Sequence, residues 1–75
     1  MQKKIVWVIE LNEPHYQFLK EDQPGDPIPT NDIYDCIISG LFFDNKKIAK
    51  QWIKQNKFLG YDVIGPLRVV LTAHT

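Results

Sequence analysis

The sequence has few of the residues and patterns that usually reveal a function. It contains a single cysteine, Cys36, and a single arginine, Arg68. One cysteine cannot form a disulfide within the chain, and small secreted domains usually depend on disulfides, so a cytoplasmic location is expected. No apolar run approaches the roughly 18 residues that a membrane-spanning helix needs. The apolar run of residues 5–9 stops at Glu10, so a signal peptide is not expected either.

Catalytic and metal-binding patterns are also missing. His15, His74 and Cys36 match no zinc-ligand spacing, so we expect no metal and no other cofactor. No glycine-rich loop is present that could hold a phosphate. The carboxylates between residues 21 and 35 lie in a proline-rich segment, which is a poor scaffold for acid–base catalysis. The sequence therefore favours a non-catalytic protein over an enzyme.

Length and composition predict one small domain, residues 1–75. The chain is 44% hydrophobic, which is enough for a core, but so short a chain buries only about 60% of its unfolded surface. Dimerisation is a common way for such chains to bury more. The formal net charge is zero, yet residues 1–40 carry −4 and residues 41–75 carry +4. We therefore expect a molecule whose charges are unevenly distributed.

Hydrophobic alternation and turn residues predict three strands and one helix. The strands cover residues 3–11, 33–43 and 61–73, and the helix lies near residues 45–57. The expected fold class is α+β in the order β-loop-β-α-β, with a three-stranded, mainly antiparallel sheet of strand order 2-1-3. The helix covers one face of this sheet. The other face is partly apolar, so a homodimer through the open face is one expectation.

The helix is the strongest pattern in the chain. Asn45 suits its N-cap and Gly60 suits its end. Its apolar residues recur with helical spacing and would face the core: Ile48, Ala49, Trp52 and Ile53. Four lysines repeat every three or four residues on the other side, at Lys46, Lys50, Lys54 and Lys57. This row could follow a phosphate backbone or bind an acidic protein, but a solvated helix face explains it as well.

Residues 12–32 form the least regular part of the sequence. They hold four of the five prolines, and Pro24-Gly25-Asp26-Pro27 predicts a turn. We therefore expect a long, proline-rich, acidic loop. Aromatic side chains beside carboxylates are typical of protein interfaces, particularly with a basic partner. The candidate partner-binding residues are His15, Tyr16, Phe18, Glu21, Asp22 and Asp26. Alternatively, the aromatic side chains fold back onto the core.

Residues 40–53 read Gly-Leu-Phe-Phe-Asp-Asn-Lys-Lys-Ile-Ala-Lys-Gln-Trp-Ile. This run resembles a strand–helix junction of small uncharacterised phage and prophage accessory proteins, in which a small residue and Phe end a strand and a polar cap, Ala and Trp follow. Two residues separate Gly40 from Phe43 here, where those proteins more often have one. The resemblance covers residues 3–11 and 38–72 and implies a β-β-α-β fold. It suggests an inhibitor or adaptor acting on a host enzyme or on host defence, and it brings no functional residues with it.

Two functions are consistent with these patterns. The first is a non-catalytic protein-binding module that acts on a larger host protein, such as a basic or nucleic-acid-binding one, through residues 12–32. The second is nucleic-acid binding through the lysine row of the helix. The near absence of arginine counts against the second function, because arginine is the usual reader of phosphates and base edges. We therefore rank nucleic acid below a protein partner.

Overall fold

Strand β1 (Gln2–Leu11) is the centre of the molecule, and its alternating side chains build a core on both of its faces. Ile9 is buried on one side, in a cluster with Ala49. Val8 is buried on the other side, in a cluster with Cys36. A strand that is apolar on both faces must be covered on both faces. The structure places one helix on each.

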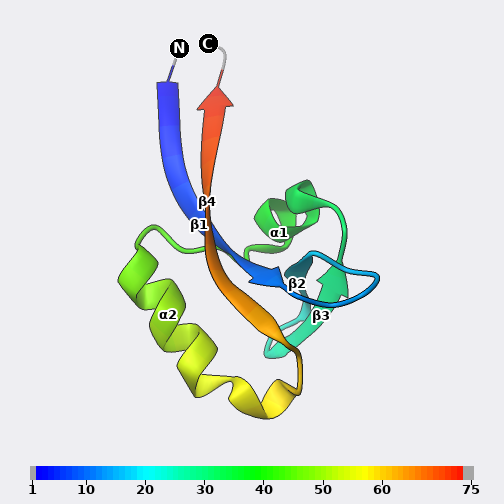
Figure 1. The fold of residues 1–75 in the computed structure, drawn as a ribbon. Helices are drawn as coiled ribbons and strands as arrows, with labels where there is room; N and C mark the ends of the chain where they lie inside the picture. The colour runs from blue at the N-terminus through cyan, green and yellow to red at the C-terminus, as the bar shows by residue number, and fades with distance from the viewer. Residues whose placement is uncertain (1, 74–75) are drawn as a thin grey trace.

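The computed structural model describes residues 2–73, without the side chains of Phe58 and Ala73 (Figure 1). After β1 the elements are β2 (Phe18–Gln23), β3 (Asp26–Thr30), α1 (Ile33–Ser39), α2 (Lys46–Gln55), the 3-10 turn η1 (Lys57–Leu59) and β4 (Val63–Ala73). All strands pair antiparallel in the order β3-β2-β1-β4. The α+β class is confirmed, and the last strand lies beside the first as predicted. The sheet has four strands rather than three.

Residues 12–32 contain a β-hairpin rather than only the expected loop. The turn lies at Pro24 and Gly25, within the predicted turn, and Gly25 has a φ of +80° that a residue without a Cβ adopts readily. Pro27 and Pro29 both belong to β3. Strands tolerate proline at a sheet edge, where the missing N–H breaks no ladder bond. Because β3 is the outermost strand, these prolines are compatible with it.

Helix α1 replaces the strand that was predicted for residues 33–43. The side chain of Asp32 caps it by accepting a hydrogen bond from the backbone N–H of Tyr34, and Gly40 ends it with a φ of +87°. Cys36 is the buried residue of this helix. Because α1 covers the second face of the sheet, the open face that suggested a homodimer is occupied by the chain itself.

Helix α2 lies where the lysine-rich pattern predicted it. The side chain of Asn45 caps its first turn, Ala49 is buried, and Trp52 is half-buried. Ile48 is 52% exposed, so it lies outside the apolar stripe to which it was assigned. The helix ends before Gly60, which closes η1 instead. Among the described helices, none is long and apolar enough to cross a membrane.

Strands β1 and β4 continue beyond the helices as a two-stranded arm (Figure 1). Their ladder runs without interruption from the pair Glu10–Gly65 to the pair Gln2–Ala73, and an irregularity follows next to Glu10. Gln2 and Ala73 therefore lie side by side at the tip of the arm. The molecule is elongated as a result, with principal extents of 40 × 24 × 23 Å.

Candidate functional site

Helix α2 directs its lysines away from the sheet. Ala49 marks the buried side of the helix. With about 3.6 residues per turn, Lys46, Lys50 and Lys54 fall together on another side. All three are exposed, and Lys57 in η1 is exposed as well. The structure therefore keeps the predicted lysine row together on one solvent-facing surface.

The arm adds two cations to the same side of the sheet. Side chains alternate along β1, so Lys3 points to the same side as Trp7. Arg68 is the cross-strand partner of Trp7, and directly opposed residues share a face. Trp7 in turn reaches α2, because the Lys46 Nζ lies 5.6 Å from the centroid of the Trp7 ring.

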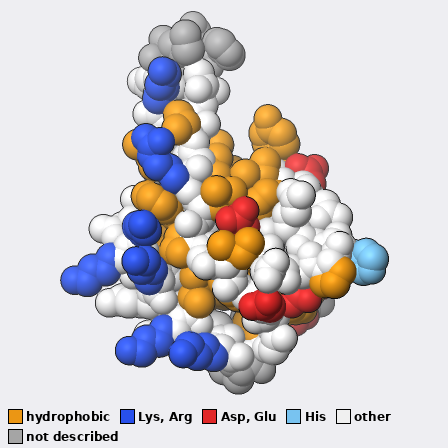
Figure 2. Space-filling model, in the orientation of Figure 1, with side chains coloured by type: hydrophobic (Ala, Val, Ile, Leu, Met, Phe, Trp, Pro, Cys, Tyr) orange, Lys and Arg blue, Asp and Glu red, His pale blue; other side chains and the backbone are white. Residues whose placement is uncertain are grey.

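We call this surface the basic face. It consists of Lys3, Lys46, Lys47, Lys50, Lys54, Lys57 and Arg68, all of them exposed. Figure 2 shows blue side chains in a column along the arm and α2, with most of the red carboxylates to the right of it. Sequence analysis identified the row on α2 but missed the two residues of the arm. The alternation of residues 3–11 could have placed Lys3, whereas Arg68 depends on a strand register that the sequence does not reveal.

The cations of the basic face are not neutralised within the described part of the chain. The ion pairs found there are Lys4 Nζ–Asp44 Oδ1 at 3.5 Å and Lys20 Nζ–Asp35 Oδ2 at 3.8 Å, and neither involves the basic face. The first turn of α2 also contains no acidic residue. The helix dipole favours carboxylates there, and Lys47 has the opposite charge. Among the described residues, the face is therefore a positive surface without ion-pair partners.

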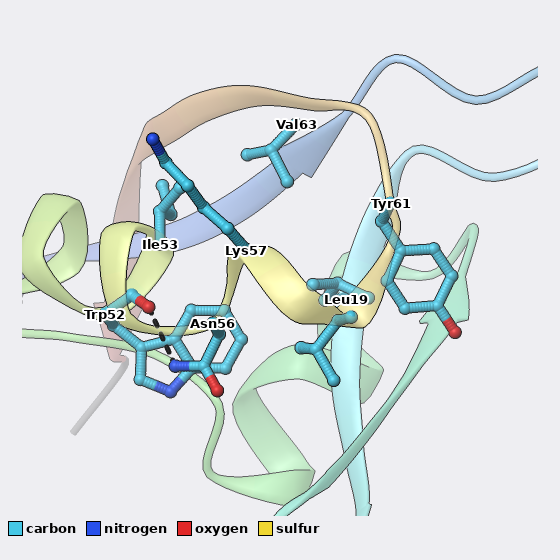
Figure 3. A pocket seen from close by; sticks show the side chains of 8 residues that line it. Leu19, Trp52, Ile53, Asn56, Lys57, Tyr61 and Val63 are labelled. Atoms are coloured by element: carbon cyan, nitrogen blue, oxygen red, sulfur yellow. Dashed lines mark hydrogen bonds between the residues drawn. The ribbon is translucent and has the colours of Figure 1, made fainter.

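A small pocket lies at the C-terminal end of the lysine row (Figure 3). Its volume is about 220 Å³, and Leu19, Trp52, Ile53 and Val63 supply much of its apolar lining. The Asn56 side-chain amide donates a hydrogen bond to the backbone carbonyl of Trp52 at 2.8 Å. Pockets that hold drug-sized ligands usually exceed about 300 Å³. We therefore describe this pocket as a feature beside the basic face and assign it no ligand.

Two of the predicted partner-binding residues serve the fold instead. Phe18 is only 8% exposed and belongs to the cluster around Cys36, so it is a core residue and not an interface anchor. Glu21 is half-buried, and its Oε1 accepts a hydrogen bond from the backbone N–H of Gly25 at 3.0 Å. This bond closes the hairpin turn.

The other four predicted residues lie at two ends of the hairpin. His15 and Tyr16 are exposed just before β2, where they help to line a shallow pocket of about 250 Å³. Asp22 and Asp26 are exposed at the turn. The length of β2 separates the two groups, about 17 Å at roughly 3.3 Å per residue. The structure therefore does not bring the predicted set into one contact surface.

An exposed apolar pair on α1 was missed in the sequence. Tyr34 and Ile38 are 68% and 83% exposed and lie one helical turn apart. They escaped notice because the segment was assigned to a strand, although the caps Asp32 and Gly40 were visible as a signal for a helix. Asp35 lies on the same helix, so the pair has carboxylates close to it in the chain.

Cys36 is placed for structure and not for nucleophilic attack. Its Sγ donates a hydrogen bond to the carbonyl oxygen of Leu19 at 3.1 Å. Burial, and then the charge of Asp35, raise the pKa of the thiol from 9.0 to about 11, and reactive cysteines need a lowered pKa. Residues 2–73 contain no cluster of His, Cys, Asp and Glu that could hold a metal ion. His74 lies outside the described residues.

The surfaces available for binding are thus a basic face on α2 and the arm, and an acidic side around α1 and the β2–β3 hairpin. No family model, curated protein or solved structure matches this chain.

Proposed function

We propose that this protein is a non-catalytic nucleic-acid-binding protein and that the basic face contacts the phosphate backbone. One observation carries the proposal. Eight of the nine Lys and Arg residues lie on α2, η1 and the β1–β4 ribbon, and only Lys20 lies elsewhere, in β2. Seven of the eight share the basic face. This distribution reverses the order of the two functions expected from the sequence alone.

The dimensions of the row suit a polyanion. From Lys46 to Lys54 the helix rises about 12 Å, at about 1.5 Å per residue. Duplex DNA carries one charge per about 1.7 Å of its axis, so about seven phosphate charges lie within that length. Several cations of the face can therefore be engaged at once without bending either partner.

The energetics of the free protein support the same function. Lysines four residues apart repel one another, and a lysine in the first turn of a helix opposes the helix dipole. Each effect costs a few tenths of a kcal/mol to about 1 kcal/mol. Bound phosphates would relieve both. Because lysine acts as a point charge and only Arg68 can form a bidentate contact, we expect binding with little sequence preference.

The test is a titration of fluorescent duplex DNA at several salt concentrations. We expect the logarithm of the affinity to fall linearly with the logarithm of salt concentration. Lys54→Gln removes one cation from the row, so it should weaken binding several-fold and lower the salt slope by about 1. Gln55→Glu changes the net charge by the same amount at the adjacent position, outside the row, and is the matched control.

The two variants separate a specific face from a general charge effect. Under the proposal, Lys54→Gln weakens binding more than Gln55→Glu does. Equal effects would show that only the net charge matters. Absence of binding at low salt for duplex and single-stranded DNA and for RNA would refute the proposal outright.

The protein-binding role remains a second candidate, and one observation favours it. Tyr34 and Ile38 are large apolar side chains that α1 leaves exposed. Asp32 and Asp35 belong to the cap and first turn of the same helix. Apolar anchors beside carboxylates suit a basic protein partner. We propose, as this alternative, an inhibitor or adaptor of a host protein in the cytoplasm, and the phage-type role rests on the sequence resemblance alone.

Capture from a host lysate tests the alternative. The immobilised wild-type chain should retain a partner, Ile38→Ser should lose it because the anchor is removed, and Lys54→Gln should keep it. Ile38 is 83% exposed, so its replacement should leave the fold intact. If the Ile38→Ser variant retains the same partner as fully as the wild type, α1 is not the contact surface.

A further inference from the structure

The four-stranded sheet has two outer edges, and the edge at β3 is closed. The carbonyl of Thr30 accepts a hydrogen bond from the N–H of Gln17 at 3.3 Å, so the backbone of Thr30 points toward β2. Backbone groups alternate in direction along a strand. Pro27 and Pro29 therefore point outward, and neither has an N–H to offer. No further strand can extend the ladder there.

The direction of the backbone groups in β1 determines which residues of β4 bond to β1 and which face the other outer edge of the sheet. Trp7 exchanges two hydrogen bonds with Phe43, at 2.7 and 2.8 Å, on the side of β1 away from β4. Odd-numbered residues of β1 thus point away from β4, and even-numbered residues point toward it. Lys4 is one of these even-numbered residues, and its partner is Leu71. The odd-numbered residues of this part of β4 therefore form the hydrogen bonds to β1.

The outer edge of β4 is consequently open beyond Pro66. Arg68, Val70 and Thr72 direct their backbone N–H and C=O groups outward. In the part of the chain that the structure describes, these groups make no hydrogen bond outside the β-ladder. Natural edge strands are protected by proline, charge or a covering segment. Here the protection consists of Pro66 and Arg68, and residues 69–72 add neither a proline nor a charge.

The arm also exposes two apolar side chains. Val70 is 44% exposed, and its cross-strand partner Ile5 is 43% exposed. Both lie between the pair Trp7–Arg68 and the tip of the ribbon. A two-stranded ribbon is marginally stable in water on its own. An additional strand on the open edge would satisfy the free backbone groups and cover the Val70 side chain.

We infer that the open edge of β4 pairs with β4 of a second copy of this chain, antiparallel, about a two-fold axis at Val70. This register places the outward residues of both copies opposite one another, with Val70 facing itself and Arg68 facing Thr72 of the second copy. If the two-fold axis moves to Val69, Pro66, which has no N–H, lies opposite Thr72. If it moves to Leu71, Arg68 has no partner among the described residues, so fewer of the described outward residues are matched.

The same register matches side chains on both faces. The Val70 side chains of the two copies meet directly on one face, and Ile5 of each copy lies on the same face one strand further out, where it does not touch the second copy. On the other face, Leu71 lies opposite Val69 of the second copy. Arg68 lies opposite a neutral residue, so no like charges meet. A symmetric, self-complementary contact of this kind is typical of homodimers.

The outer edge of β1 in the arm is the competing site for a second strand. Its outward residues there are Lys3 and Ile5, because Phe43 already occupies the edge at Trp7. It is the shorter of the two edges, and its lysines would approach those of the second copy. Proline substitutions distinguish the two edges, since a proline at an outward position removes one outward N–H and leaves the β1–β4 ladder intact.

Light scattering after size exclusion gives the first test. The wild-type chain should elute with twice the mass of one chain at high concentration and dissociate on dilution. Val70→Pro should raise the dissociation constant at least tenfold, whereas Ile5→Pro should leave it within a few-fold of wild type. The reverse pattern would place the contact at β1, and a chain that stays monomeric at its highest soluble concentration overturns the inference.

A pair of charge variants tests the register. Val70→Lys and Val70→Glu should each be monomeric, because the two-fold axis sets like charges against each other. An equal mixture should form a heterodimer. If Val70→Lys still dimerises as well as the wild type, the proposed register is wrong. The dimer does not rest on nucleic-acid binding, since Val70→Pro and Ile5→Pro keep every cation of the basic face and can be titrated with DNA separately.

Discussion

The buried thiol of Cys36 makes the free energy of unfolding depend on pH in the alkaline range. Its pKa is raised from 9.0 to about 11 by burial and by the charge of Asp35. Below pH 9 the thiol is protonated in both the folded and the unfolded chain and contributes no pH dependence. Between pH 9 and 11 the unfolded chain ionises and the folded chain does not, so the free energy of unfolding falls as pH rises.

We expect this effect to amount to about 2 kcal/mol at pH 11. Urea unfolding of the wild type and of Cys36→Ala, below pH 9 and at pH 11, measures it. Cys36→Ala lowers stability at every pH by removing buried atoms, so the quantity to compare is the change with pH. The change should be smaller in Cys36→Ala. Identical changes in both proteins would mean that the thiol ionises as easily in the folded chain.

Single residues also mark the limits of the sequence analysis. Lys46 and Lys54 could be assigned to one exposed row because helical spacing alone places them there. Phe18 could not be assigned, because an aromatic residue in a polar segment fits an interface and a core equally well. Only the pairing of Glu10 with Phe18 directs this side chain to the face that α1 covers.

At the scale of the element, a lysine of α2 that is proposed to bind nucleic acid also lowers the stability of the helix. Lys47 lies in the first turn, where its charge opposes the helix dipole. We predict that Lys47→Glu raises the free energy of unfolding by about 0.3–1 kcal/mol and weakens DNA binding. Lys54→Glu makes the same charge reversal in the last turn, so it should lower the free energy of unfolding while it also weakens binding.

Urea unfolding and DNA titration of both variants provide the measurement. If the two variants shift the free energy of unfolding in opposite directions and both weaken binding, charge is the common cause. If Lys47→Glu left binding unchanged, the N-terminal turn of α2 would not belong to the contact surface. Low ionic strength is required for both measurements, because salt screens the interactions of exposed charges.

The elements differ in how far the sequence could predict them. Helix α2 and strand β1 were predicted because each has one clear hydrophobic period. The segment of α1 is rich in β-branched and apolar residues, and the weak strand preference of Ile33 and Ile37 was outweighed by caps at Asp32 and Gly40. Strand β3 contains two prolines, which indicate a loop unless the strand is known to lie at an edge.

For the whole molecule, the sequence showed that charge is divided between the two halves but not how the halves meet. Lys3 belongs to the acidic half in sequence, yet in β1 it lies on the same face of the ribbon as Trp7 and as Arg68, the cross-strand partner of Trp7. Lys46 of α2 in turn approaches the ring of Trp7. Strand register is determined by the global fold, so the combined basic face could not be found by local patterns. The exposed pair on α1 depended likewise on the correct assignment of one element.

The pairing of the first strand with the last has a consequence for the order of folding. The β2–β3 hairpin and both helices form from residues close together in sequence, so each can appear while later residues are still being synthesised. Strand β1 holds core residues on both faces, but its long ladder forms only with β4, which follows every other described element in the chain. Closing a loop of this length costs entropy before the contacts reward it. Among the described elements, β1 is therefore made before all the others, and its longest ladder is completed after all of them.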